Sequence, residues 1–266
     1  MRSYITLIKM RFILLLQYRA AAFAGICTHV LFGFVRVMIL IAFFSNGGEY
    51  PLNLKDTVTY VWLSQSLLGM FPWNGDKEIQ AMIKTGGVAY ELCRPTNLYF
   101  TWYSRALALR IAPTILKSFP IFLFSMVFLK DPYRMYPPES FLSFVLWIIG
   151  TILALFLSCA MTNIITILTL FTISGEGLNR ILPSFIIFFS GMIVPLPLFP
   201  DNFKKVLEVM PFSSVLDVPL RLYIGNIAPD RAVYFFTLQV VWILILVGFG
   251  YLLLKKALKR VEIMGG

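Results

Sequence analysis

The sequence predicts an all-α integral membrane protein with six transmembrane helices and no soluble domain. Two observations carry this prediction: the mean hydropathy is +0.81, and only 14% of the 266 residues are charged. A soluble domain of this length could not bury so much apolar surface. The apolar residues also fall in long runs, and about 20 helical residues cross the hydrocarbon layer of a bilayer. Residues 1–266 are therefore expected to form one transmembrane domain.

The six predicted spans are apolar runs separated by charged or turn-forming stretches. In chain order they cover residues 21–44, 57–73, 107–129, 141–172, 181–199 and 232–254. The fourth run contains 32 residues, so its helix must tilt or project beyond the hydrocarbon.

Residues 1–20 precede the first span and place basic residues at positions 2, 9, 11 and 19 among Ile, Leu and Phe. This pattern is typical of an amphipathic helix in the cytoplasmic interface of a membrane. The alternative is a plain basic flank of the first span. The apolar run that follows is too long for the core of a signal peptide, so we expect a retained span.

The distribution of Lys and Arg predicts the orientation. With both termini in the cytoplasm, inner segments carry 14 of the 23 basic residues and outer segments carry 7, while Arg36 and Lys117 lie within spans. Basic residues concentrate on the cytoplasmic side of membrane proteins. This rule also explains the net charge of +10, so no nucleic-acid partner is expected. Residues 74–110 are then a cytoplasmic loop.

Several chemical signatures are missing from the sequence. It has no GxxxxGK[ST] phosphate loop, no HExxH and no recognisable catalytic triad, so we expect no catalytic residue, cofactor or metal in this chain. Cys27, Cys93 and Cys159 are scattered, and His29 is expected to be a packed or hydrogen-bonded span residue. All 13 acids fall in loops or at span ends, which argues against an ion-coupled carrier.

The stretch 74–110 is polar, with three acids and five bases. Its acids favour a helix start, a short apolar face follows at spacing i, i+3, i+4, and two glycines and a proline end the helical pieces. Those features are carried by Asp76, Glu78, Ile79, Met82, Ile83, Gly86, Gly87 and Pro95. The stretch is either a rigid docking element for a cytoplasmic partner that supplies energy, or an ordinary solvated helix.

The outer end of the fifth span contains Pro195, Pro197 and Pro200, which should break the helix and free carbonyl groups. Irregular backbone persists at membrane depth only where protein shields it or a cavity borders it. Residues 203–210 and 213–225 read as short amphipathic helices that are too short to cross. We expect residues 195–230 to form a hairpin that re-enters the membrane from outside; the alternative is a plain outer loop.

Two segments resemble one family. The stretch MIKTGGVAYELCRPTNLYFTW is similar to the cytoplasmic loop between the second and third helices of type-2 ATP-binding-cassette (ABC) permeases. The matching positions are Ile83, Gly86 or Gly87, Leu92, Arg94 and Pro95. Residues 188–225 resemble the fifth helix and outer hairpin of that family, with Met210-Pro211-Phe212 as the last element, and ALKRVEIMGG resembles its ending. The small six-helix bacterial members are the most similar.

The resemblance implies the permease subunit of an ATP-driven exporter in a bacterial plasma membrane. Two such subunits, alike or different, would pair among the membrane lipids, and each would dock on an ABC ATPase subunit that binds ATP and Mg²⁺. Residues 76–94 would form the coupling helix, the N-terminal helix would touch the same ATPase, and the outer gate would include Pro195, Pro197, Pro200, Pro211 and Phe212. The other classes considered are an ion-coupled carrier, an interfacial lipid-modifying enzyme, and a structural or sensory subunit. The resemblance indicates no particular substrate.

Arg36 and Lys117 are the two basic residues within predicted spans. A cation in mid-membrane costs roughly 2.5–3.5 kcal/mol on insertion scales. Lys117 is expected to extend toward the cytoplasmic interface. Arg36 is expected either to meet the outer acids Glu49 or Asp56 or to line the substrate path, where it would favour an anionic or zwitterionic amphiphile.

Overall fold

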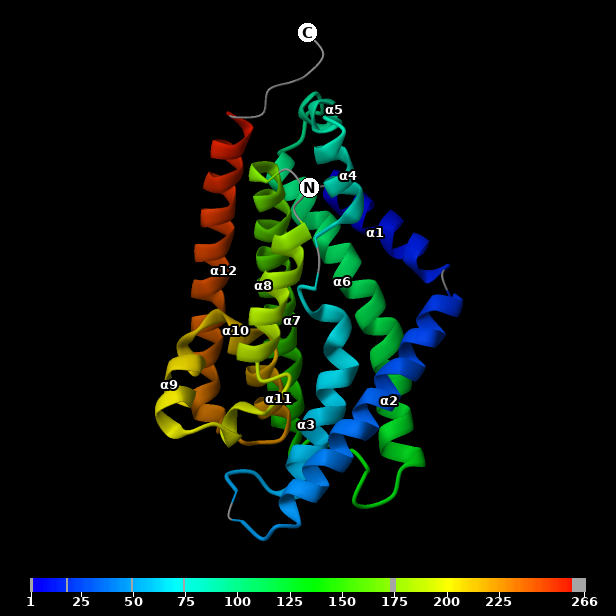
Figure 1. The fold of residues 1–266 in the computed structure, drawn as a ribbon, viewed down its shortest axis with the longest axis vertical. Coiled ribbons are helices and arrows are strands. Elements are labelled where there is room, and N and C mark those ends of the chain that lie inside the picture. Colours follow the sequence, from blue (N-terminus) through cyan, green and yellow to red (C-terminus); the bar gives the residue numbers. More distant parts are fainter. Residues whose placement is uncertain (1, 18, 49, 74, 173–175, 260–266) are drawn as a thin grey trace.

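The computed structural model describes residues 2–17, 19–48, 50–73, 75–172 and 176–259, and every regular element in those ranges is a helix (Figure 1). Four elements are long and apolar enough to cross a membrane: Phe23–Phe44, Leu98–Phe128, Phe141–Phe171 and Pro229–Leu258. They correspond to α2 (Arg19–Phe44), α6 (Leu98–Leu123) with a π-helical turn (Phe124–Phe128), α7 (Phe141–Leu168) with a 3-10 turn (Thr169–Phe171), and α12 (Pro229–Leu258). The predicted all-helical membrane class is confirmed.

The other two predicted spans are shorter in the structure. α3 (Leu54–Ser66) has 13 residues and continues in a 3-10 turn (Leu67–Met70), and α8 (Glu176–Phe189) has 14. At 1.5 Å per residue each α-helix is about 20 Å long, less than the hydrocarbon thickness of about 30 Å. The count of six spans therefore stays a prediction. The third predicted span also begins too late, because α6 starts at Leu98 and includes Arg105 and Arg110.

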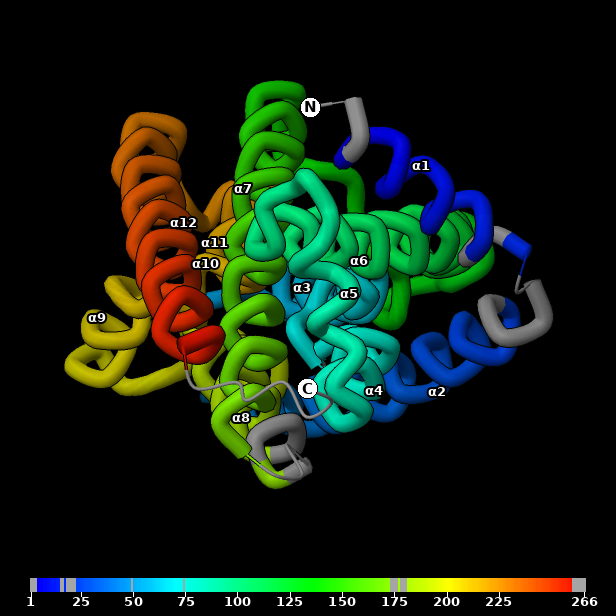
Figure 2. Tube along the Cα trace, turned by 90° about the horizontal axis from the view of Figure 1, so that it is seen from above, coloured from blue at the N-terminus to red at the C-terminus, as the bar shows by residue number. Residues whose placement is uncertain are grey.

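The short helices gather at the two ends of the molecule (Figure 1). α4 (Lys77–Lys84) and α5 (Val88–Leu92) lie at the end where α12 finishes, and α1 (Arg2–Leu16) lies in the same half. α9 (Asp201–Val209), α10 (Pro211–Val215) and α11 (Asp217–Tyr223) lie in the opposite half. Viewed along the longest axis of the molecule, α7 lies between α12 and α6, and α1 packs against α6 (Figure 2).

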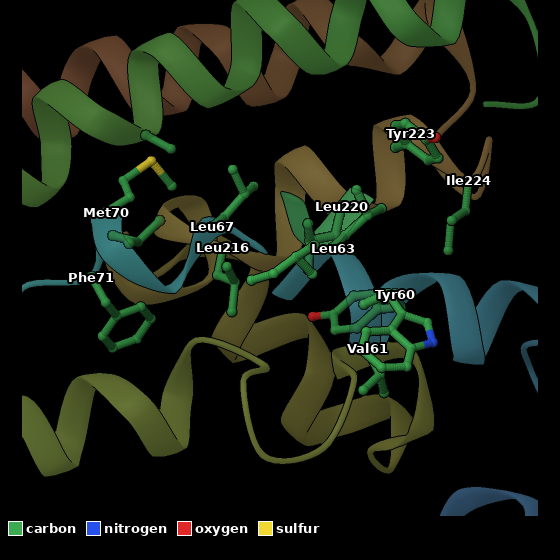
Figure 3. Close-up of a cluster of buried hydrophobic side chains, with 14 of the residues drawn as sticks. Tyr60, Val61, Leu63, Leu67, Met70, Phe71, Leu216, Leu220, Tyr223 and Ile224 are labelled. Carbon is green, nitrogen blue, oxygen red and sulfur yellow. The ribbon is translucent and has the colours of Figure 1, made fainter. Parts of the chain in front are cut away.

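The main apolar core surrounds α3. Tyr60, Val61, Trp62 and Leu63 are fully buried, although four successive residues of a helix point in different directions. α3 is therefore enclosed on every side over this turn, by α2, α6 and the helices of the outer hairpin. Figure 3 shows side chains of α3 meeting those of α11 and the chain before it. A helix too short to span the bilayer is thus stabilised by protein neighbours around its whole circumference.

Candidate functional site

The α4–α5 tip, residues 75–97, is capped and turned as the sequence predicted. The Asp76 carboxylate accepts hydrogen bonds from the backbone N–H groups of Glu78 (2.9 Å) and Ile79 (3.4 Å), which caps α4. Gly86 has φ +74°, a left-handed conformation that favours glycine and ends α4. α5 ends at Leu92, three residues before Pro95.

The apolar face of α4 points into the protein, which corrects one expectation. Ile79 is fully buried in a cluster with Tyr99, Trp102 and Ile167, and Met82 and Ile83 are partly buried against the same cluster. Ile79 is therefore not available to a partner, because α6 and the end of α7 cover it, whereas Met82 and Ile83 keep part of their surface exposed. The i, i+3, i+4 spacing identifies an apolar face but does not say which surface will cover it.

Arg105 of α6 organises the acids of the tip. Its side chain is 7% exposed, and Nε donates to Asp76 Oδ2 at 2.8 Å while Nη2 donates to Glu78 Oε2 at 2.9 Å. Nη1 lies 3.9 Å from Glu91 Oε1, and the other oxygen of Glu91 accepts a 2.8 Å hydrogen bond from the indole of Trp102. We call Asp76, Glu78, Glu91 and Arg105 the Arg105 cluster. It fastens both α4 and α5 to α6.

The N-terminal helix is bound to the same cluster. Arg11 of α1 donates from Nη1 to Glu78 Oε1 at 3.1 Å, and the hydroxyl of Tyr4 accepts a 3.2 Å hydrogen bond from the backbone N–H of Asn97. The predicted separate N-terminal helix is confirmed as a helix, α1. Its contact with the tip was not foreseen, because Arg11 and Glu78 are 67 positions apart.

The exposed surface of the tip differs from the predicted one. Tyr90 of α5 is 81% exposed and Leu92 is 45% exposed. Arg94, whose side chain is 63% exposed, lies 3.8 Å from Glu91. The apolar side chains that the tip presents outward therefore come from α5 rather than from α4.

The outer prolines begin short elements rather than ending α8. α8 already ends at Phe189, before Gly191, which has φ +80°. Pro195 precedes a 3-10 turn (Leu196–Leu198), Pro200 precedes α9, and Pro211 is the first residue of α10. Proline suits such positions because a backbone N–H at the start of a helix has no partner within the helix, so the N–H that proline lacks is not needed there. The predicted short helices are present, and Phe212 packs against Phe189 with ring centroids 6.0 Å apart.

A fully buried carboxylate, Asp217 of α11, joins α11 to α3. Its Oδ1 accepts hydrogen bonds from the Tyr60 hydroxyl (2.9 Å) and the Leu196 N–H (3.3 Å), and Oδ2 accepts one from Arg221 Nη1 (3.3 Å). Arg221 also pairs with Glu208. We call Tyr60, Glu208, Asp217 and Arg221 the Asp217 cluster.

A cavity of about 570 Å³ lies between α2, α3 and the chain after α8. Arg36 lines it and donates to the Ser64 hydroxyl (3.2 Å) and to the carbonyls of Met192 and Ile193 (3.1 Å for Ile193). His29 also lines it, and its Nδ1 donates to the Gln65 carbonyl at 3.0 Å. His29 is thus hydrogen bonded as predicted. Among the described residues Arg36 pairs with a hydroxyl and with carbonyls of the chain after α8, and not with Asp56; Glu49 lies outside the described residues.

Lys117 of α6 contacts the same face of α2 as this network, at Gly25, one helical turn before His29. A Cβ atom placed on Gly25 would come 2.8 Å from Lys117 Nζ, so the ammonium group packs directly on the backbone of α2. Gly25 lies toward the α1 end of that helix. That Lys117 extends toward the cytoplasmic interface stays a prediction.

Sequence reasoning missed Arg105, Trp102, Tyr60, Asp217 and Arg221. One signal was available, since Asp217 and Arg221 stand at i, i+4, the spacing of paired charges on a helix. Nothing local marks Tyr60 or Trp102, whose partners are remote in sequence. Within the described ranges, no three His, Cys, Asp or Glu side chains gather as metal ligands.

Comparison with known proteins identifies the family. A model of the family described as ABC-2 family transporter protein matches residues 29–265, nearly the whole chain. No curated protein matches the chain significantly. The match agrees with the helical membrane architecture and with the resemblance seen in residues 83–95 and 188–225. The chain belongs to the ABC-2 family of transporter proteins and is a multi-pass membrane permease component of an ABC transporter, a class that works with ABC ATPase subunits.

Proposed function

We propose that the chain is one permease subunit of an ATP-driven exporter in a bacterial plasma membrane, with both termini and the α4–α5 tip in the cytoplasm. A second permease subunit, alike or different, would complete the substrate path. Each subunit would dock its tip on an ATPase subunit that binds ATP and Mg²⁺. The observation that carries the proposal is the Arg105 cluster, because it makes the tip one unit with α1 and α6.

The proposed coupling follows from that attachment. Arg105 belongs to α6, and its partners lie on or beside α4 and α5, so a displacement of the tip is passed directly to a long apolar helix. Charge-assisted hydrogen bonds shielded from water are among the stronger contacts in proteins, which suits a connection that must survive repeated motion. Through Glu78 and Arg11 the same displacement reaches α1.

The surface proposed to meet the ATPase is the exposed part of α5 around Tyr90. We expect Tyr90→Asp to lower co-purification of the ATPase and transport, because a carboxylate would have to be desolvated in an interface without a partner. Asn97→Asp is the matched control: it adds the same charge nearby and keeps the oxygen that caps α6. Ile83→Asp is a less specific test, since Ile83 is partly buried against the Ile79 cluster and a carboxylate there would also disturb that packing.

Full ATPase association and transport by Tyr90→Asp would contradict this docking surface. Loss of both in Asn97→Asp as well would mean that added charge, rather than the position, is responsible.

The proposed orientation is tested by chemical labelling. Thr85→Cys places a thiol at an exposed position beside the turn, and it avoids the left-handed conformation that would strain a cysteine at Gly86. In a background without native cysteines, we expect a membrane-impermeant maleimide to label position 85 only after the cells are opened. Labelling from outside intact cells would place the tip on the other side of the membrane.

A further inference from the structure

The cavity beside Arg36 combines polar and apolar walls in a regular way. His29, Phe32, Arg36 and Ile39 line it from α2 at spacings of three or four residues, with Thr28 beside His29, so one face of that helix forms a wall. Arg36 is seven residues beyond His29, which places the two polar groups about 10 Å apart along the helix. The volume of about 570 Å³ falls within the range of ligand sites, about 300–1,000 Å³.

The cavity carries the positive charge of Arg36, and no acid among the described residues compensates it. The hydrogen bonds of Arg36 go to a hydroxyl and to two carbonyl oxygens, all of them neutral. Within the described ranges no carboxylate pairs with Arg36. A guanidinium has five N–H donors and stays protonated in proteins, so the site retains both charge and donor capacity.

The mouth of the cavity is apolar. Phe32, Ile39 and Ile193 line it, and each exposes more than half of its surface. Only a few polar groups, among them Gln65 of α3, line the remaining wall. A ligand with a single charged group and a long apolar part matches this division, because its charge would meet Arg36 while its chain left through the mouth.

We infer that this cavity binds a single-chain amphiphile with an anionic head group, the head beside Arg36 and the alkyl chain along Phe32, Ile39 and Ile193. The binding is independent of the proposed docking on an ATPase, since every contact lies within this chain. The alternative is that a partner subunit covers the mouth of the cavity. In that case the cavity would show no preference for the charge of an added amphiphile.

The test uses the full-length chain in phosphatidylcholine nanodiscs without ATPase or ATP. Three photoactivatable probes share one diazirine-bearing alkyl chain and differ in the head: a carboxylate at mildly alkaline pH, an alcohol and an amine. We expect the carboxylate probe to label peptides covering 28–40 and 192–194 about tenfold more than the amine, since one charge-assisted hydrogen bond supplies a preference of that size. Excess unlabelled oleate should compete.

Two pairs of variants separate the contributions of charge and space. Arg36→Gln should reduce the preference for carboxylate over amine to about one, whereas Lys55→Gln, which removes an exposed cation outside the cavity, should leave it unchanged. Ile39→Trp should fill the mouth and reduce labelling by the carboxylate probe, whereas Met38→Trp, at a position that is also more than half exposed but lies outside the cavity, should not.

Ile39→Trp keeps the proposal testable if Arg36→Gln does not fold. Equal labelling by all three probes in the unmodified chain, or labelling unaffected by Ile39→Trp, would overturn the proposal. Full ATPase association by Tyr90→Asp would contradict the docking surface but would leave these binding results untouched, so the two proposals fail separately.

Discussion

The two ends of this permease each contain a buried charge, and they use it in opposite ways. At the α4–α5 tip a buried cation, Arg105, gathers acids that lie on or beside two short helices. In the outer hairpin a buried anion, Asp217, gathers donors from α3, α11 and the chain before α9. In the first arrangement the side chain of Glu78 is exposed at the surface, whereas in the second Asp217 is fully buried.

This difference indicates different tasks for the two clusters. A cluster that reaches the surface can connect additional elements, as Glu78 does with Arg11 of α1. An enclosed carboxylate fixes a single arrangement, because any movement that removes one donor leaves a buried charge under-solvated. We therefore expect the Asp217 cluster to govern the stability of the fold and the Arg105 cluster to govern the attachment of the α4–α5 tip.

The largest effect is expected at Asp217. Asp217→Asn keeps the shape but removes the charge opposite Arg221, and losing one partner of a buried pair costs about 3–5 kcal/mol. Denaturation of the purified protein in detergent, followed by circular dichroism, would measure the lost free energy of unfolding. Asp230→Asn, at an exposed position where α12 begins, is the control and should behave like the unmodified chain.

A smaller effect is expected at Arg105. Arg105→Gln leaves Asp76 and Glu91 buried with weaker partners, although Arg94 and Arg11 remain nearby, so we expect a loss of about 3 kcal/mol at most. Limited proteolysis should also cleave the tip faster. Arg94→Gln removes an exposed charge of the same type and should cost within about 1 kcal/mol. Equal losses in the two variants would show that the cluster has no special role.

The smallest effect is expected at Tyr60. Tyr60→Phe removes one donor to Asp217 and one contact with the Gly191 carbonyl, and it keeps the packing of the ring. Leaving a buried acceptor with one bond fewer costs about 1–2 kcal/mol. Tyr234→Phe, on the exposed side of α12, is the control for the same denaturation measurement. A loss as large as that of Asp217→Asn would mean that the hydroxyl, and not Arg221, dominates the cluster.

The sequence by itself determined the features that depend on local composition. The limits of α7 and the position of α12 follow from hydropathy, and the turn at Gly86 and the cap at Asp76 follow from residue type. These features are decided within one or two helical turns, so they can be read along the chain. Even there, the sequence placed the start of α6 nine residues too late, because Arg105 and Arg110 looked like loop residues until their partners were known.

Only the tertiary structure decided which surface each residue meets. Ile79 was expected to face a partner and instead packs against α6. For Arg36 the sequence left two alternatives open, an acid or the substrate path, and it did not foresee the carbonyl partners 156 and 157 positions away. Asp217 looked like a loop acid until the fold brought Tyr60 to it across 157 positions. The physical reason is the same in each case: the free energy of a buried polar or apolar group depends on the neighbours that remove it from water, and those neighbours come from distant parts of the chain.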